Sequence, residues 1–350
     1  MDIKEIAKQM VAPKKGILAA DESNNTAEKR LASINMESTE DNRRAYRELF
    51  LGMEGIENQL SGVILYDETI RQTMSDGTPF TKHLQNIGVM PGIKVDMGVQ
   101  ELPNFPGEHY TAGLDGLRAR LKEYYDLGAR FTKWRCVINI GENLPTEAAI
   151  HTNAHGMAMY AALVQEAGMV PMVEPEVILQ GSHTIEQSYD VTTRTLKVLF
   201  ELLTHFRVDL AGVILKTSMV ISGSECAEQA SAEQVAEMTM KCLKEAVPAE
   251  CGGIVFLSGG QSAEQATENL NAINQAAEDA PWQLTFSYAR ALQGPSLKIW
   301  GGEPSNIPAA REKFLERLEA NSDAREGTLT GSNDREHRST ENGVNENVTA

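Results

Sequence analysis

The chain has 350 residues, of which 41% are hydrophobic and 23% charged, as in globular proteins. Its net charge of −17 argues against nucleic-acid binding, and it means that any anionic ligand must meet locally clustered basic residues. No stretch approaches the ~18 unbroken apolar residues of a membrane span. The first residues do not form an export signal, so we expect a cytoplasmic protein whose four cysteines are reduced.

Short apolar runs recur along the chain, and amphipathic segments such as 146–168 and 262–280 separate them. This alternation predicts parallel βα units. Eight strands over roughly 280 residues favour a closed (β/α)8 TIM barrel, which typically needs ~250 residues. A doubly wound sheet is the alternative, but no GxGxxG or Walker motif follows any run. The predicted strands are 16–21, 61–67, 89–96, 129–138, 169–177, 211–219, 252–260 and 283–290.

The C-terminal segment differs from the rest of the chain. Residues 321–350 are rich in Asn, Ser, Thr, Glu and Gly, have almost no large apolar side chains and show no periodicity. Such a composition buries too little surface to offset the entropy lost on ordering. We therefore expect a barrel domain over residues 1–320, followed by a disordered tail over 321–350.

Charged side chains occur where several predicted strands end, which is where TIM barrels carry their catalytic residues. Alternate residues of a strand point to the same side, so Lys133 shares a side with Arg135 and Glu174 with Glu176. Taken singly, a lysine at a strand end is usually solvated, and Glu-Pro-Glu is usually a turn. Their common location at one end of one barrel favours a site. The polar residues at this end are Asp21, Lys94, Asp96, Lys133, Arg135, Glu174, Glu176, Lys216, Ser258, Ser287 and Arg290.

Lys216 ends the apolar run GVILK, which is an unusual place for a lysine unless the amine has a chemical role. A neighbouring cation such as Lys133, together with desolvation, would favour the neutral amine that attacks a ketone. The resulting iminium accepts electrons when the adjacent C–C bond breaks. Glu174 or Glu176 could transfer the protons that iminium formation needs, and Asp21 could accept a proton from a substrate hydroxyl. Asp21 could equally cap the next helix.

The stretch FLSGGQS (256–262) leads from a strand through two glycines into a helix. Glycines permit close approach of the backbone, and a helix N-terminus attracts anions. Because the last two barrel strands often hold phosphate, we expect Ser258, Gly259 and Arg290 to bind one. Without the barrel, this stretch would be an ordinary βα turn. Only His151 and His155 have a ligand-like spacing, and they lack an HExxH frame, so we expect no metal site.

Seven motifs together resemble the class I fructose-1,6-bisphosphate aldolases in order and spacing, over about residues 10–320. The resemblance implies a metal-independent (β/α)8 barrel without a cofactor, commonly tetrameric. It also implies reversible cleavage of fructose 1,6-bisphosphate to dihydroxyacetone phosphate and glyceraldehyde 3-phosphate in glycolysis and gluconeogenesis. The motifs are GILAADES (16–23), GIKVD (92–96), KWRC (133–136), VEPE (173–176), ILK (214–216), FLSGGQS (256–262) and FSYAR (286–290).

The resemblance also implies a role for each matching residue. Lys216 matches the Schiff-base lysine, Glu174 the general acid/base, and Lys133 the lysine beside the nucleophile. Asp21 matches the aspartate at the C4 hydroxyl. The residues that match phosphate contacts are Ser258, Gly259 and Arg290 for the phosphate on C1, and Ser23, Arg30 and Lys94 toward the other phosphate.

The sequence departs from the animal members of the family at several positions. Thr217-Ser218 replaces Pro-Asn, Met97 replaces a lysine, and Ala289 replaces a glycine. Animal members end in a tyrosine that assists proton exchange on the enamine, whereas the last tyrosine here is Tyr288. We therefore expect the C3 proton to be handled inside the barrel by Glu174, Glu176 or a bound phosphate.

Two other functions remain open at this point. One is another Schiff-base aldolase or transaldolase acting on a sugar monophosphate, which the paired basic residues around Lys94 and Arg290 argue against. The other is a non-catalytic barrel used as a binding scaffold, which the complete set of lysines and carboxylates argues against.

Overall fold

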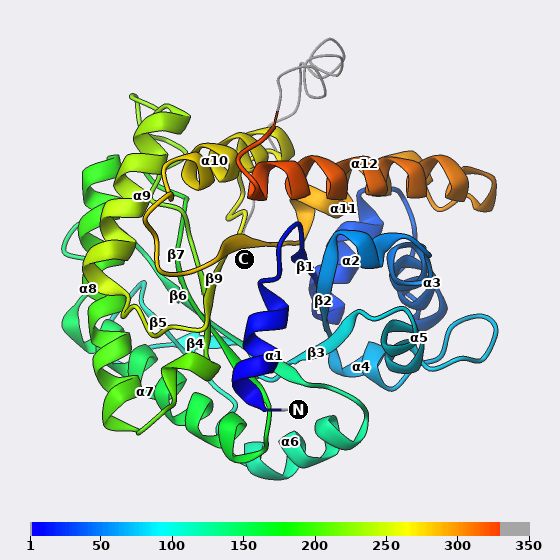
Figure 1. Ribbon diagram of the computed structural model, residues 1–350, viewed down its shortest axis with the longest axis horizontal. Coiled ribbons are helices and arrows are strands. Elements are labelled where there is room, and N and C mark those ends of the chain that lie inside the picture. Colours follow the sequence, from blue (N-terminus) through cyan, green and yellow to red (C-terminus); the bar gives the residue numbers. More distant parts are fainter. Residues whose placement is uncertain (1, 330–350) are drawn as a thin grey trace.

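The barrel strands come from all eight predicted apolar runs, so the TIM-barrel prediction is confirmed. The computed structural model describes residues 2–329, and its strands close in the order β1-β10-β9-β8-β7-β6-β3-β2 (Figure 1). Every neighbouring pair in this barrel is parallel. The strands are β1 (Gly16–Ala20), β2 (Leu60–Leu65), β3 (Met90–Lys94), β6 (Phe131–Ile138), β7 (Val170–Val177), β8 (Ile214–Thr217), β9 (Gly253–Phe256) and β10 (Leu284–Tyr288).

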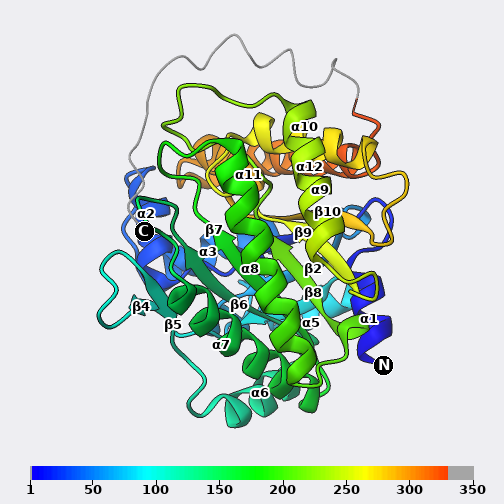
Figure 2. The same cartoon turned by 90° about the vertical axis from the view of Figure 1, so that its left-hand side faces the viewer.

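Helices surround the barrel, and Figure 2 shows α7, α8 and α9 on one side of it. Several begin at a Ser or Thr whose hydroxyl accepts a hydrogen bond from the first turn, as helix N-caps do. The predicted helical segments 146–168 and 262–280 correspond to α7 and α10. The helices are α1 (Ile3–Met10), α2 (Asn24–Ala32), α3 (Glu40–Leu51), α4 (Asp67–Ile70), α5 (Phe80–Asn86), α6 (Leu117–Asp126), α7 (Glu147–Glu166), α8 (Ile185–His205), α9 (Ala232–Ala246), α10 (Ala263–Gln275), α11 (Arg290–Trp300) and α12 (Ile307–Arg325).

Apolar side chains fill the inside of the barrel below the predicted site. They form one buried cluster with the apolar face of α1, which closes this end of the barrel. The ring of Phe131 occupies much of the interior, because a Cβ at Gly62 or Gly92 would approach that ring to 3.0 or 2.3 Å. The strand residues of the cluster are Ile17, Ala19, Ile64, Phe131, Val170, Met172, Ile214 and Val255.

Two features differ from the sequence-based expectations. A short antiparallel hairpin, β4 (Val99–Glu101) with β5 (His109–Thr111), follows β3 and was not predicted. The predicted start of the tail at residue 321 is wrong, because α12 continues to Arg325. Asn321, Ser322, Ala324 and Arg325 are buried, whereas residues 330–350 of the predicted tail lie outside the described residues.

No helix in the described part of the chain combines the length and the apolar character that a membrane span requires.

Candidate functional site

Four charged side chains lie in the barrel interior directly above the apolar cluster. Each follows a member of that cluster by two residues, so the alternation along a strand directs both to the inside. The pairs are Ala19 with Asp21, Phe131 with Lys133, Met172 with Glu174, and Ile214 with Lys216. On four different strands, an apolar side chain in the interior is thus followed two residues later by a charged one.

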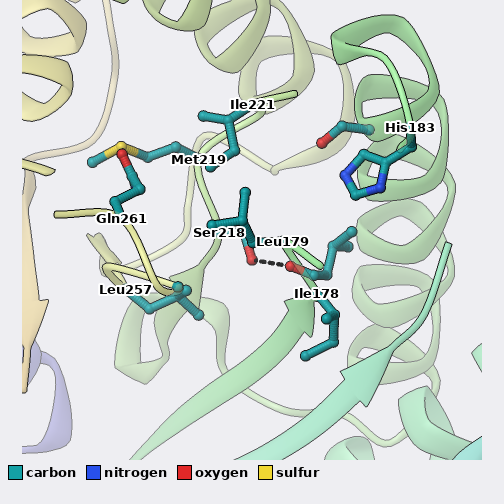
Figure 3. Close-up of a pocket in the computed structure, with 11 residues that line it drawn as sticks. Ile178, Leu179, His183, Ser218, Met219, Ile221, Leu257 and Gln261 are labelled. Carbon is teal, nitrogen blue, oxygen red and sulfur yellow. Dashed lines mark hydrogen bonds between the residues drawn. The ribbon is translucent and has the colours of Figure 1, made fainter. Parts of the chain in front are cut away.

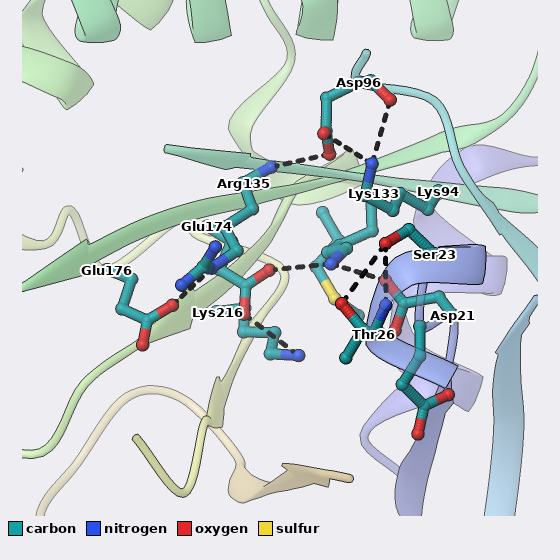
Figure 4. Close-up of polar contacts among 12 residues, drawn as sticks. Asp21, Ser23, Thr26, Lys94, Asp96, Lys133, Arg135, Glu174, Glu176 and Lys216 are labelled. Atoms are coloured by element: carbon teal, nitrogen blue, oxygen red, sulfur yellow. Dashed lines mark hydrogen bonds and ion pairs between the residues drawn. The ribbon is translucent and has the colours of Figure 1, made fainter. Parts of the chain in front are cut away.

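Three ion pairs link the four charged groups in a row (Figure 4). Lys216 Nζ lies 3.0 Å from Glu174 Oε1, and Lys133 Nζ lies 3.2 Å from Glu174 Oε2. Lys133 Nζ also lies 2.6 Å from Asp21 Oδ2. All four residues are buried, with at most 8% of their surface exposed. Glu174 therefore bridges the two lysines, and Lys133 bridges the two carboxylates.

The neighbouring cations keep the carboxyl groups of Glu174 and Asp21 ionised. Burial alone would raise the pKa of Glu174, but Lys133, Lys216 and Arg135 outweigh it and lower that pKa. The pKa of Asp21 is likewise lowered, because Lys133 and Lys216 oppose the effect of burial. Burial would lower the pKa of Lys133, but Asp21 and Glu174 raise it, so Lys133 is a cation at neutral pH. A proton acceptor therefore lies within hydrogen-bonding distance of the Lys216 amine.

Two further ion pairs flank these four residues. Lys94 Nζ lies 2.6 Å from Asp96 Oδ1 and donates to the Asp96 carbonyl at 2.9 Å. Asp96 also accepts a hydrogen bond from the backbone N–H of Arg135 at 3.3 Å. On the other flank, the Arg135 guanidinium binds Glu176. The sequence placed Asp96 at a strand end without a role. The structure shows that Asp96 forms an ion pair with Lys94. The two-residue spacing of Lys94 and Asp96, which places both side chains on one side of the strand, was the sequence signal for this contact.

The stretch after β9 has the geometry of an anion-binding turn. Gly259 and Gly260 adopt φ values of 59° and 100°, which residues with a side chain rarely adopt. A Cβ at Gly260 would lie 3.6 Å from a terminal nitrogen of Arg290. Helix α10 then begins after Ser262, whose hydroxyl accepts the N–H of Gln265 at 3.0 Å. The loop and Arg290 therefore lie side by side.

Two guanidinium groups lie close together near this loop. Burial lowers the pKa of Arg290, and the charge of Arg30 lowers it further. Arg30 Nε and Ser287 Oγ are both buried, and neither has a hydrogen-bond partner among residues 2–329. Such a concentration of donors fits an anion such as phosphate. Arg30, which the resemblance grouped with Ser23 and Lys94, thus acts electrostatically on Arg290 as well.

Ser23 lies on the opposite flank, at the N-terminus of α2. Its hydroxyl accepts the N–H of Thr26 at 3.4 Å and lies 3.2 Å from the Thr26 hydroxyl (Figure 4). Sequence reasoning missed Thr26, which presents a second hydroxyl there. The signal was the i, i+3 spacing of Ser23 and Thr26 across a helix start.

The positions that depart from the animal sequences fit the local backbone. Ser218 Oγ donates to the carbonyl of Val177 at 2.9 Å and so joins the ends of β8 and β7 (Figure 3). Ala289 has a φ of −106°, which lies outside the left-handed region that favours glycine. Met97 is 66% exposed. Tyr288, the last tyrosine, points away from the site and donates to the carbonyl of Ala266 on α10 at 3.0 Å.

A small cavity lies beside the loop that follows β9 (Figure 3). Ser218, His183, Gln261 and Gly259 contribute to its lining, and its volume is about 10 Å³. That volume holds roughly one water molecule. This cavity is therefore too small for a sugar-sized ligand.

No group of three or more His, Cys, Asp or Glu side chains in the described ranges is arranged to hold a metal ion. His151 and His155 are exposed on α7, and His151 Nε2 lies 3.5 Å from Glu147.

Comparison with known proteins agrees with this geometry. The family model described as "Fructose-bisphosphate aldolase class-I" matches residues 2–348. The chain is 55% identical to a probable fructose-bisphosphate aldolase class 1 of Xanthomonas campestris pv. campestris, over 93% of this chain and 98% of that protein. It is 53% identical to the cytosolic fructose-bisphosphate aldolase 6 of Arabidopsis thaliana, over 91% and 89%.

A solved structure of fructose-bisphosphate aldolase from Plasmodium falciparum, in complex with TRAP and a small-molecule inhibitor, is also similar. It superposes with a TM-score of 0.92 at 45% identity, over 94% of this chain and 95% of that one. From its sequence, its fold and these matches, the chain belongs to the class I fructose-bisphosphate aldolase family.

Proposed function

We propose that this protein cleaves D-fructose 1,6-bisphosphate reversibly to dihydroxyacetone phosphate and D-glyceraldehyde 3-phosphate, through a Schiff base on Lys216. The observation that carries the proposal is the Glu174 carboxylate, which lies between the Lys216 and Lys133 ammonium groups inside a closed barrel. Membership of the aldolase family supports the same reaction. In this role the enzyme serves glycolysis and gluconeogenesis.

Iminium formation begins with a proton transfer from Lys216 to Glu174, whose contacting atoms are 3.0 Å apart. The neutral amine then attacks the C2 ketone and forms a carbinolamine. Protonated Glu174 gives its proton to the departing hydroxyl, which leaves as water. The proton that Lys216 gave to Glu174 therefore leaves in the water molecule, and the positive charge of the lysine is now on the iminium. Lys133 stays charged throughout and holds Glu174 in place.

Cleavage follows when a base takes the proton of the C4 hydroxyl. Asp21 fills this role, because its carboxylate is ionised and is held by Lys133 at 2.6 Å. The C3–C4 electrons flow into the iminium and give an enamine, while C4 leaves as the aldehyde. We infer that the C3 proton is returned within the barrel, by Glu174, Glu176 or a bound phosphate.

The two phosphates bind to two groups of basic and hydroxyl residues around the linked ion pairs. Ser258, Gly259, Ser287 and Arg290 hold the phosphate on C1. The resemblance assigns Ser23, Arg30 and Lys94 to the other phosphate, and Arg30 also lies close enough to Arg290 to lower its pKa. Arg135 holds Glu176 in place. Basic residues in both groups favour a bisphosphate over a monophosphate, which ranks other Schiff-base aldolases and transaldolases second.

The relatives from Arabidopsis thaliana that are named as cytosolic enzymes suggest a cytoplasmic location here. By resemblance to the family we also infer a homotetramer.

One assay tests the reaction. Purified protein is given fructose 1,6-bisphosphate or fructose 1-phosphate, with and without EDTA. We expect cleavage that is faster with the bisphosphate and unaffected by EDTA. Loss of activity in EDTA with recovery on adding zinc would overturn the Schiff-base mechanism, and no cleavage at all would favour a binding scaffold.

A further inference from the structure

A buried ionic contact lies directly behind the loop that carries Asp21. Asp21, Glu22 and Ser23 are consecutive, and the Asp21 and Ser23 side chains lie in the site. The Glu22 side chain instead contacts α3, where its carboxylate pairs with the Arg47 guanidinium and accepts the Tyr46 hydroxyl proton at 3.0 Å.

Arg47 holds the same residue at a second point. Its other terminal nitrogen donates to the main-chain carbonyl of Glu22 at 2.8 Å. Both side chains of the pair are buried, with 4% of Arg47 and 7% of Glu22 exposed. The Arg47 guanidinium also lies 5.1 Å from the centre of the Tyr46 ring, and that ring packs edge-on against Phe50. The Arg47 guanidinium is therefore held in place by the buried aromatic side chains of α3.

We propose that Arg47 is a positioning residue for Asp21: by gripping both the carboxylate and the carbonyl of Glu22, it fixes the peptide that follows Asp21 and aims the Asp21 carboxylate at Lys133. A buried ion pair is a poor source of net stability, so its placement behind a site residue points to conformational control. A guanidinium can reach two acceptors at once, whereas a lysine ammonium cannot reproduce that planar fork. This inference rests on the proposed role of Asp21 in cleavage.

The test is Arg47→Lys, made in the unaltered protein and in an Asp21→Asn background. Misplacing a catalytic group by ~1 Å can cost about a hundredfold in rate, so we expect kcat for bisphosphate cleavage to fall roughly ten- to hundredfold. Borohydride trapping of dihydroxyacetone phosphate on Lys216 should stay within about twofold, since that step does not need Asp21. In the Asp21→Asn background, Arg47→Lys should change the residual kcat by less than about twofold, because both changes act through one group.

Two further variants complete the experiment. Arg43→Lys is the matched control, because Arg43 lies one turn earlier on α3 and pairs with Glu68 at 2.6 Å, away from the loop. It should leave kcat unchanged. Tyr46→Phe removes one donor to Glu22 and keeps the buried ring, so it should give a smaller loss of kcat that also disappears in the Asp21→Asn background. It carries the test alone if Arg47→Lys does not fold.

An unchanged kcat in a folded Arg47→Lys protein would overturn the positioning role. Equal losses in both backgrounds would do the same, since they would indicate a general structural effect. Failure of the unaltered protein to cleave the bisphosphate would overturn the proposed function itself, and the role of Arg47 with it.

Discussion

At the scale of single residues, the site is an alternation of charges in a space from which water is largely excluded. Glu174 contacts two lysines and Lys133 contacts two carboxylates, so each buried charge has an opposite charge beside it. Buried ion pairs of this kind add little net stability, but losing one partner leaves a charge unpaired and costs about 3–5 kcal/mol. The arrangement therefore keeps reactive groups ionised and in place.

The first prediction concerns the pH dependence of stability. Asp21 and Glu174 have pKa values lowered from 3.8 and 4.5. A lowered pKa in the folded state contributes stability above the ordinary value, and this stability is lost as the pH falls through the lowered value. We expect the free energy of unfolding in urea to fall below pH 4.5, and to fall less steeply for Glu174→Gln. Glu316→Gln, at an exposed pair with Lys313, should keep the original slope. Equal slopes for all three proteins would contradict the assignment.

The second prediction concerns Arg290. A charge-assisted hydrogen bond to phosphate contributes roughly 1.5–3 kcal/mol, or about one to two decades in kcat/KM. Arg290→Ala should lower kcat/KM for the bisphosphate by that amount, with the nearby Arg30 limiting the loss. Arg118→Ala, at an exposed pair with Glu166, is the matched control and should have no effect. An unchanged kcat/KM for Arg290→Ala would place the phosphate elsewhere.

At the scale of elements, the eight strands were predictable because each is an apolar run bounded by helical sequence. The charged strand ends were predictable for the same reason, since Lys133, Glu174 and Lys216 keep a fixed two-residue step from apolar interior positions. The hairpin of β4 and β5 was not predictable, because its strands have three residues each and no apolar period. The last turns of α12 were missed because the sequence there is polar, although its contacts are buried.

Those last turns give the third prediction. Ser322 Oγ donates to the carbonyl of Lys14 at 2.8 Å, and Arg325 donates to the side chain of Gln283 at 2.7 Å. A chain ending at residue 320 loses both contacts, and each is worth about 0.5–1.5 kcal/mol. We expect it to melt at least ~3 °C below a chain ending at residue 329. The longer chain should also keep its cleavage rate and its C3 proton exchange. A tenfold loss of exchange with intact iminium trapping would assign a catalytic role to residues 330–350.

At the scale of the whole molecule, an acidic chain gathers many of its cations at one end of the barrel. The chain carries a net charge of −17, yet the barrel mouth gathers Arg30, Lys94, Lys133, Lys216 and Arg290. Composition could argue against nucleic-acid binding, but it could not show this clustering of cations, which depends on closing the barrel. Likewise, the contact of Glu22 with α3 joins residues 25 positions apart and left no sequence pattern.

The central claim is that Lys216 is the nucleophile, and borohydride reduction in the presence of dihydroxyacetone phosphate tests it most directly. Reduction converts the iminium into a stable secondary amine, and peptide mapping by mass spectrometry then locates it. We predict one adduct per chain, on Lys216, formed equally well in EDTA and absent from Lys216→Met. An adduct on Lys94 or Lys133 instead, or no adduct in a protein that still cleaves the bisphosphate, would contradict this account.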